Sequence, residues 1–200
     1  DAVFHHMADN YYTKDKRVDW VDSTTMVKIK EQIIKTKYSR CGLYAPNLIL
    51  PDTTGKTHSL GAIKAEYTIL YFWSATCGHC KKATPKLYEM YKRLKSHGVE
   101  IYTVHIDDNE KALKGYLKEH QFDWINTNAP NNEFNYRVYY DIFSTPVIYV
   151  LDKDKKIIAK RIDVVTLEKI LSDKLGVTPP DHILNPKKDD KKDEHDGHDH

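Results

Sequence analysis

The chain contains a buried strand followed at once by a helix, and this pair constrains the fold most. Residues 66–73, EYTILYFW, are rich in β-branched and aromatic side chains without polar alternation, which is typical of a strand covered on both faces. Residues 78–97 then change to a helical period that ends at Gly98. One face of that helix is apolar: Leu87, Met90, Tyr91 and Leu94. A strand of this kind needs helices packed on its sheet.

The alternation of strand and helix continues along the chain. Residues 99–106 predict a second buried strand, 110–120 an exposed helix, and 144–162 two strands joined by a turn at DKDK. Residues 165–176 predict a closing helix capped by Gly176. This order predicts an α/β fold, a mixed sheet with helices on both faces.

The two ends differ in texture from this domain. Residues 1–42 predict a helical N-terminal extension, because 26–38 places apolar residues at helical spacing. The main domain is expected at 43–176 and starts with a hairpin turn at DTTGK. Residues 177–200 contain almost nothing apolar in KKDDKKDEHDGHDH and predict a disordered, charged, His-rich tail.

Charge and hydropathy limit the partners and the membrane association that the chain can have. With 31 basic and 29 acidic residues, the net charge is +2 and no basic stripe is interleaved with aromatics, so we expect no nucleic acid partner. The apolar run TILYFW is about a third of a membrane span. Since the chain opens at Asp1 without Met, we expect that a targeting segment was removed, and membrane anchoring through that N-terminus stays open.

Two cysteines, Cys77 and Cys80, enclose Gly78 and His79 where the strand meets the helix. Such a pair can bind a metal, form a structural disulfide or cycle as a redox catalyst. A structural zinc site needs four ligands, and Cys41 stands far upstream with no second CxxC. A structural disulfide between Cys77 and Cys80 would close a very short loop and add little stability. The catalyst is favoured, and the other two stay as alternatives.

The position of the pair assigns its roles. At the first turn of a helix, unpaired N–H groups and the helix dipole favour a thiolate, so Cys77 is the expected nucleophile. Cys80 lies one turn further and is the expected resolving thiol, which attacks the mixed disulfide. Gly78 allows close approach of a partner chain, and a cationic His79 would stabilise the thiolate further.

The segment WSATCGHCKKATP resembles the active-site segment of thioredoxin-fold proteins, W-x-x-x-C-x-x-C-K followed by a proline. The matching positions are Trp73, Cys77, Cys80, Lys81 and Pro85. The resemblance implies that Thr145 and Pro146 form a cis pair against the two cysteines. With Trp73 they would shape the substrate groove, and the pair would keep metals off the thiols, so neither a metal nor another cofactor is expected.

The lead-in APNLILPDTTGK resembles the TlpA/ResA-like extracytoplasmic branch of these proteins, and the stretch from Cys77 to Pro146 leaves room for its added strand and helix. The helical extension is similar to that of Bacteroidetes thioredoxin-like proteins, commonly exported or lipid-anchored. The resemblance covers about residues 43–176. It implies a bacterial, extracytoplasmic thiol:disulfide oxidoreductase, in the periplasm or at the outer membrane, with protein thiol or disulfide substrates and an upstream redox partner.

Two positions depart from the family. Tyr71 stands where a buried acid is expected six residues before the first cysteine, and Ala83 where the TlpA/ResA branch often has Glu. The direction of electron flow therefore stays open. Two alternatives also stay open: a peroxiredoxin-like peroxidase, although SAT before Cys77 does not supply P-x-x-x-T-x-x-C, and a redox-inactive binding module. The tail histidines, His195, His198 and His200, are interpreted as solvated, with loose metal binding as the alternative.

Overall fold

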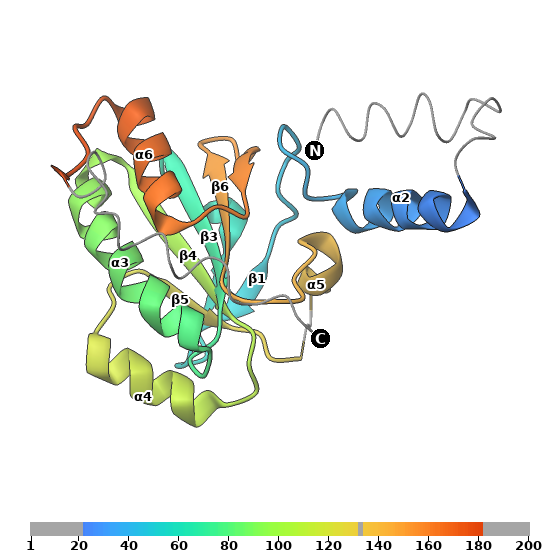
Figure 1. Cartoon of the computed structure of the whole chain (residues 1–200). Helices are drawn as coiled ribbons and strands as arrows, with labels where there is room; N and C mark the ends of the chain where they lie inside the picture. Colours follow the sequence, from blue (N-terminus) through green and yellow to red (C-terminus); the bar gives the residue numbers. More distant parts are fainter. Residues whose placement is uncertain (1–21, 132–133, 182–200) are drawn as a thin grey trace. The chain divides into compact units, whose positions relative to one another are not determined.

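The structure is a computed structural model that describes residues 22–131 and 134–181 (Figure 1). The described residues up to Ile162 belong to one compact unit, and those from Asp163 onward to a second. The predicted tail disorder and the three tail histidines lie outside the described residues, as do residues 1–21 of the N-terminal extension. The domain limits expected at 42/43 and 176/177 stay predictions.

The first unit alternates strands and helices as the sequence predicts. Its elements are α2 (Ser23–Thr36), β1 (Ile49–Pro51), β2 (Thr57–Ser59), β3 (Tyr67–Trp73), α3 (Gly78–Leu94), β4 (Val99–His105), α4 (Glu110–His120), β5 (Ile125–Asn128), α5 (Tyr136–Tyr139), β6 (Val147–Asp152) and β7 (Ile157–Lys160), with short 3-10 turns at Leu60–Ala62 and Lys95–His97. The second unit contains α6 (Val164–Leu175), which Gly176 caps with φ +65°, as expected.

The main sheet has five strands in the order β5-β4-β3-β6-β7. β4 runs parallel to β3 and β5 parallel to β4, whereas β6 pairs antiparallel with β3 and β7 antiparallel with β6. The mixed sheet predicted from the sequence is confirmed. Because β6 runs opposite to β3, its first residue, Val147, pairs with Phe72 near the end of β3. The loop before β6 and the loop after β3 therefore reach the same edge of the sheet.

The strand and helix that flank the CxxC follow from their own residues. All of β3 after Tyr67 is buried, as its continuous apolar run requires. In α3 the predicted apolar face, Leu87, Met90, Tyr91 and Leu94, is buried. The turn after α3 ends at Gly98, whose φ is +84° and whose added Cβ would lie 2.9 Å from the Cγ of Glu66, so glycine is required there.

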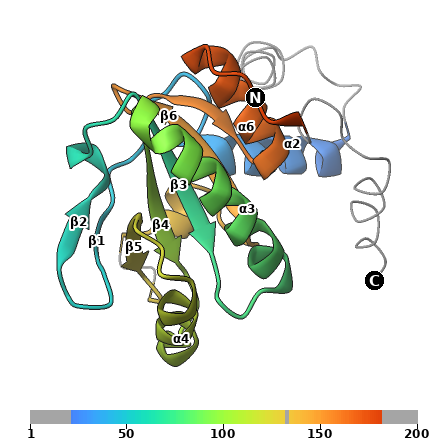
Figure 2. The same cartoon turned by 90° about the vertical axis from the view of Figure 1, so that its left-hand side faces the viewer.

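Each face of the sheet carries a different set of side chains. On one face Phe72 packs against Tyr136, Tyr140 and Tyr149, with ring centroids 5.8, 5.3 and 6.3 Å away, and α5 covers this face. On the other face α3 and α4 cover β3, since Tyr71 contacts Thr84 of α3 and Trp73 contacts Tyr116 of α4 (Figure 2). Helices on both faces are thus confirmed.

The N-terminal helix is confirmed, although it begins earlier than the apolar pattern. Asp22 caps α2 by accepting a hydrogen bond from the N–H of Thr25 at 2.9 Å. Strand β5 and the four-residue helix α5 fill the stretch between Cys77 and Pro146 where the resemblance implied added elements. Among the described residues, no helix combines the length and hydropathy that a bilayer span requires.

Candidate active site

The two cysteines of the CxxC lie at the start of α3 and differ in exposure. Cys77 is the N-cap residue of the helix and is partly exposed, whereas Cys80 is buried. The Sγ of Cys77 accepts a hydrogen bond from the N–H of Cys80 at 3.4 Å. Both side chains are thiols here, as is that of the exposed Cys41. A partner can therefore reach the sulfur of Cys77 but not that of Cys80.

The loop before β6 supplies the other wall of the site. The Thr145–Pro146 peptide bond is cis, and the thiol of Cys77 donates to the carbonyl oxygen of Thr145 at 3.5 Å. This contact joins residues 68 positions apart, and it exists because β6 runs antiparallel to β3. The structure thus brings together Cys77, Cys80 and the Thr145–Pro146 pair.

The surroundings push the pKa values of the two thiols in opposite directions. Partial burial raises the pKa of Cys77, but hydrogen bonding with Cys80, with the side chain of Thr145 and with the backbone N–H of His79 outweighs it, so the pKa is lowered overall. Burial raises the pKa of Cys80 to about 12, although the backbone of Ser74 partly opposes it. One sulfur is prepared as a thiolate, and the other stays protonated.

The remaining predicted site residues lie around this pair. Gly78 is exposed, and an added Cβ would meet no atom within 4 Å, so this chain does not itself require glycine there. His79 is exposed and acts on Cys77 through its backbone N–H. Trp73 is only 1% exposed and packs against Tyr71, with ring centroids 6.4 Å apart. Its part in substrate binding stays a prediction, and burial limits it to support from below the surface.

Neither position where the family pattern expects an acid carries one. The hydroxyl of Thr84 donates to the carbonyl oxygen of Cys80 at 2.7 Å, so the hydroxyl of Tyr71, 3.0 Å away, is the donor to Thr84. Burial raises the pKa of Tyr71 far above its ordinary value, and nearby Cys80 adds to the shift. Tyr71 is therefore a neutral hydroxyl, and Ala83 is a half-exposed methyl.

A carboxylate absent from the sequence-based candidates lies beside the CxxC loop. Asp107, just after β4, accepts hydrogen bonds from the hydroxyls of Ser74, at 2.8 Å, and Thr76. Its other oxygen accepts from the N–H of Asn109 at 3.0 Å. The Thr76 bond, together with that of Ser74, lowers the pKa of Asp107 despite partial burial. The sequence feature that could have indicated Asp107 is an acidic residue directly after a buried strand. Adjacent parallel strands end at the same edge of a sheet, so such a residue lies near the loop that follows the neighbouring strand.

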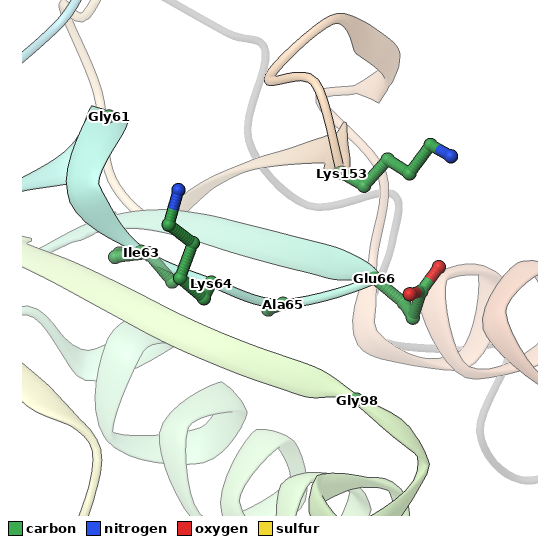
Figure 3. A pocket seen from close by; sticks show the side chains of 7 residues that line it. All are labelled: Gly61, Ile63, Lys64, Ala65, Glu66, Gly98 and Lys153. Atoms are coloured by element: carbon green, nitrogen blue, oxygen red, sulfur yellow. The ribbon is translucent and has the colours of Figure 1, made fainter.

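No other described feature competes with this site. Within residues 22–131 and 134–181, no three His, Cys, Asp or Glu side chains gather as metal ligands would. A shallow hollow of about 430 Å³ is lined by Gly61, Ile63, Lys64, Ala65, Glu66, Gly98 and Lys153 (Figure 3). It lies where β3 and β4 begin, whereas the cysteines follow the end of β3. The hollow is therefore separate from the CxxC.

A CxxC with unequal thiols, at the start of a helix on a five-stranded mixed sheet and beside a cis-proline loop, defines a thioredoxin-like thiol-disulfide oxidoreductase. A thioredoxin-like family model matches residues 65–157. The thiol-disulfide oxidoreductase ResA of a Bacillus cereus strain is 31% identical over 138 residues, 69% of this chain and 79% of that protein. The chain belongs to the TlpA/ResA-like family of thiol-disulfide oxidoreductases.

Solved structures agree with this assignment. A domain of a possible thiol-disulfide isomerase from Cytophaga hutchinsonii ATCC 33406 is 38% identical with a TM-score of 0.63, covering 68% of this chain and 92% of that one. A thiol:disulfide interchange protein from Bacteroides sp. is 28% identical with a TM-score of 0.62, covering 73% and 97%. The predicted fold and enzyme class are confirmed.

Proposed function

We propose that Cys77 and Cys80 cycle between dithiol and disulfide through a mixed disulfide with protein substrates. The observation that carries this proposal is the inequality of the two sulfurs. The pKa of Cys77 is lowered and its sulfur is partly exposed, while Cys80 is buried with its pKa raised to about 12. An exposed thiolate beside a shielded thiol suits a nucleophile and a resolving group.

The reaction proceeds in two exchanges. The thiolate of Cys77 attacks a sulfur of the substrate disulfide, forms the mixed disulfide and expels one substrate thiolate, which takes a proton. The thiol of Cys80 then loses its proton and attacks the sulfur of Cys77. The Cys77–Cys80 disulfide forms, the second substrate thiolate leaves, and two electrons have passed to the substrate. The reverse sequence oxidises a substrate dithiol.

The cis loop gives the substrate its place in this proposal. The carbonyl oxygen of Thr145 lies 3.5 Å from the sulfur of Cys77. A substrate cysteine bonded to Cys77 would therefore have its backbone next to Thr145. Thr145 and Pro146 would hold an extended substrate segment, Gly78 would let it approach, and Trp73 would support the surface from below.

The compartment and partners belong to the same proposal. We propose that the protein acts outside the bacterial cytoplasm, in the periplasm or at the outer membrane, and that an upstream redox partner restores the pair after each turnover. The resemblance to the extracytoplasmic TlpA/ResA branch supports the location. The protein expressed from its own gene with a C-terminal tag tests it by fractionation and by accessibility to a membrane-impermeant thiol reagent, and recovery in the cytoplasmic fraction would contradict it.

A trapping experiment tests the chemistry. In Cys80→Ala, the mixed disulfide of Cys77 with a disulfide-bonded protein such as insulin should accumulate and be released by dithiothreitol. Cys77→Ala should trap nothing, and Cys41→Ala should behave as the unmodified chain. If Cys80→Ala traps no substrate, the proposed redox cycle is wrong, and the result favours a redox-inactive binding module. Rapid turnover of hydrogen peroxide instead would favour the peroxidase.

A further inference from the structure

The carboxylate of Asp107 holds the loop between β3 and α3 through hydrogen bonds. The Oδ2 atom of Asp107 accepts hydrogen bonds from the hydroxyls of both Ser74 and Thr76, the residues on either side of Ala75. The two hydroxyls also contact each other at 2.9 Å, and the N–H of Thr76 donates to the Oγ of Ser74 at 3.1 Å. This closed group ends at the residue before Cys77.

Ser74 connects that group to both cysteines. Its carbonyl oxygen accepts a hydrogen bond from the N–H of Cys77 at 3.3 Å. The backbone of Ser74 also lowers the pKa of the Cys80 thiol, against the larger effect of burial. A movement of Ser74 would therefore displace the start of α3 and change the contact to the buried sulfur at the same time.

Asp107 comes from a different part of the chain, and its own position is fixed. It follows β4, whose last residue, His105, pairs with Trp73, the last residue of β3. The N–H of Asn109 donates to its Oδ1 atom at 3.0 Å, and Asn109 caps α4. The carboxylate therefore ties the CxxC loop to the β4–α4 connection. Hydrogen bonds to a charged acceptor are also stronger than neutral ones.

We propose that Asp107 is a positioning residue that holds Ser74 and Thr76, and through them sets the geometry in which Cys77 ionises and Cys80 attacks. This inference rests on the proposed redox cycle. In this role Asp107 acts through the backbone of residues 74–76, to which the N–H of Cys77 is bonded, and it needs no contact with either sulfur.

The sign of its effect separates positioning from charge. A carboxylate near Cys77 disfavours a thiolate by repulsion, so removing the charge alone would speed alkylation of Cys77. Releasing the loop has the opposite effect, because the N–H groups that stabilise the thiolate lose their alignment. Slower alkylation after removal of Asp107 is therefore the signature of positioning.

The experiment measures alkylation of Cys77 by iodoacetamide in the full chain at pH 6.5, resolved by peptide mass spectrometry. Asp107→Ala should slow the reaction about tenfold, the change that corresponds to one unit of thiol pKa. Asp107→Asn keeps one oxygen for the two hydroxyls and should stay within about threefold of the unmodified chain. Asp108→Ala is the matched control, because this neighbour carries the same charge and should change the rate less than about twofold.

Each other outcome overturns the inference. A rate in Asp107→Ala within twofold of the unmodified chain would show that the loop holds itself. Equal effects of Asp107→Ala and Asp108→Ala would show a charge effect only. If Asp107→Ala does not fold, Thr76→Val and Ser74→Ala each remove one hydroxyl, and rates unchanged in both would equally overturn it. If Cys77 in the unmodified chain reacts no faster than Cys41, the proposed redox cycle itself fails.

Discussion

The hydroxyl of Tyr71 lies 3.0 Å from the Oγ1 atom of Thr84, directly under the helix that carries both cysteines. Thr84 uses its own proton on the carbonyl oxygen of Cys80, so Tyr71 donates and cannot relay a proton onward through that bond. A neutral hydroxyl is also too weak a base to accept the proton of Cys80. In the proposed cycle, the step in which Cys80 attacks therefore proceeds without a buried carboxylate at this position.

Replacing Tyr71 tests this conclusion. Tyr71→Phe removes the hydroxyl and should change the rate of the resolving step at pH 7 less than about threefold, while costing about 1 kcal/mol of unfolding free energy for the lost hydrogen bond. Tyr71→Asp introduces a base beneath Cys80 and should speed that step at pH 7 and flatten its pH dependence. Single-turnover reduction of a disulfide substrate measures both. A tenfold slower Tyr71→Phe would mean that the hydroxyl takes part in proton transfer.

The three cysteines should react with alkylating agents in a fixed order. The pKa of Cys77 is lowered, that of Cys80 is raised to about 12, and Cys41 is exposed. Since the thiolate is the reactive form, Cys77 should be modified first between pH 6 and 8 and Cys80 only after unfolding. Peptide-resolved mass spectrometry over this pH range measures the order, with Cys41 as the internal reference. Equal rates at Cys77 and Cys41 would contradict it.

Stability should fall as the pH drops below about 6.5 because of His105. Its side chain is fully buried, and burial lowers its pKa although Asn128, 3.2 Å away, and Asp107 partly oppose the shift. The unfolded chain, with an imidazole pKa of about 6.5, then binds the proton more readily than the folded chain. The contribution is therefore complete above that pH and lost below it. Urea unfolding at pH 7.5, 6.5 and 5.5 should show a steeper decline than in His105→Gln, and parallel curves would refute this.

The aromatic core and the exposed aromatic surface should respond differently to truncation. Phe72 is fully buried among Tyr136, Tyr140 and Tyr149, so Phe72→Ala should cost roughly 3–5 kcal/mol of unfolding free energy. Phe143 is 71% exposed, and Phe143→Ala should stay within about 0.5 kcal/mol. Urea unfolding of the two variants measures the difference. Similar losses would mean that Phe143 is covered in solution.

Local patterns predicted the elements around the CxxC because each depends on neighbouring residues. The unbroken apolar run of β3, the period of α3 and the stop at Gly98 are all visible in the sequence. Strand β5, INTN, and the four-residue helix α5 carry too short a pattern to be recognised. Their existence depends on pairing with β4 and on packing against the aromatic cluster.

The site was only partly predictable for a related reason. Cys77 and Cys80 are close in sequence, whereas the contact of Cys77 with Thr145 joins residues 68 positions apart and was expected from a family resemblance alone. Asp107 could not be recognised from the sequence, because its hydroxyl partners, Ser74 and Thr76, are distant in the chain. They come near Asp107 only because the parallel strands β3 and β4 end at the same edge of the sheet.

Because β6 pairs antiparallel with β3, the position of Thr145 beside Cys77 does not depend on the length of the chain between them. Both halves of the site are attached to paired strands, β3 and β6. The segment from α4 to the loop before Thr145 adds the edge strand β5 to the sheet and carries neither cysteine. Insertions or deletions in the loops of this segment should therefore leave the mutual geometry of Cys77, Cys80 and Thr145 unchanged.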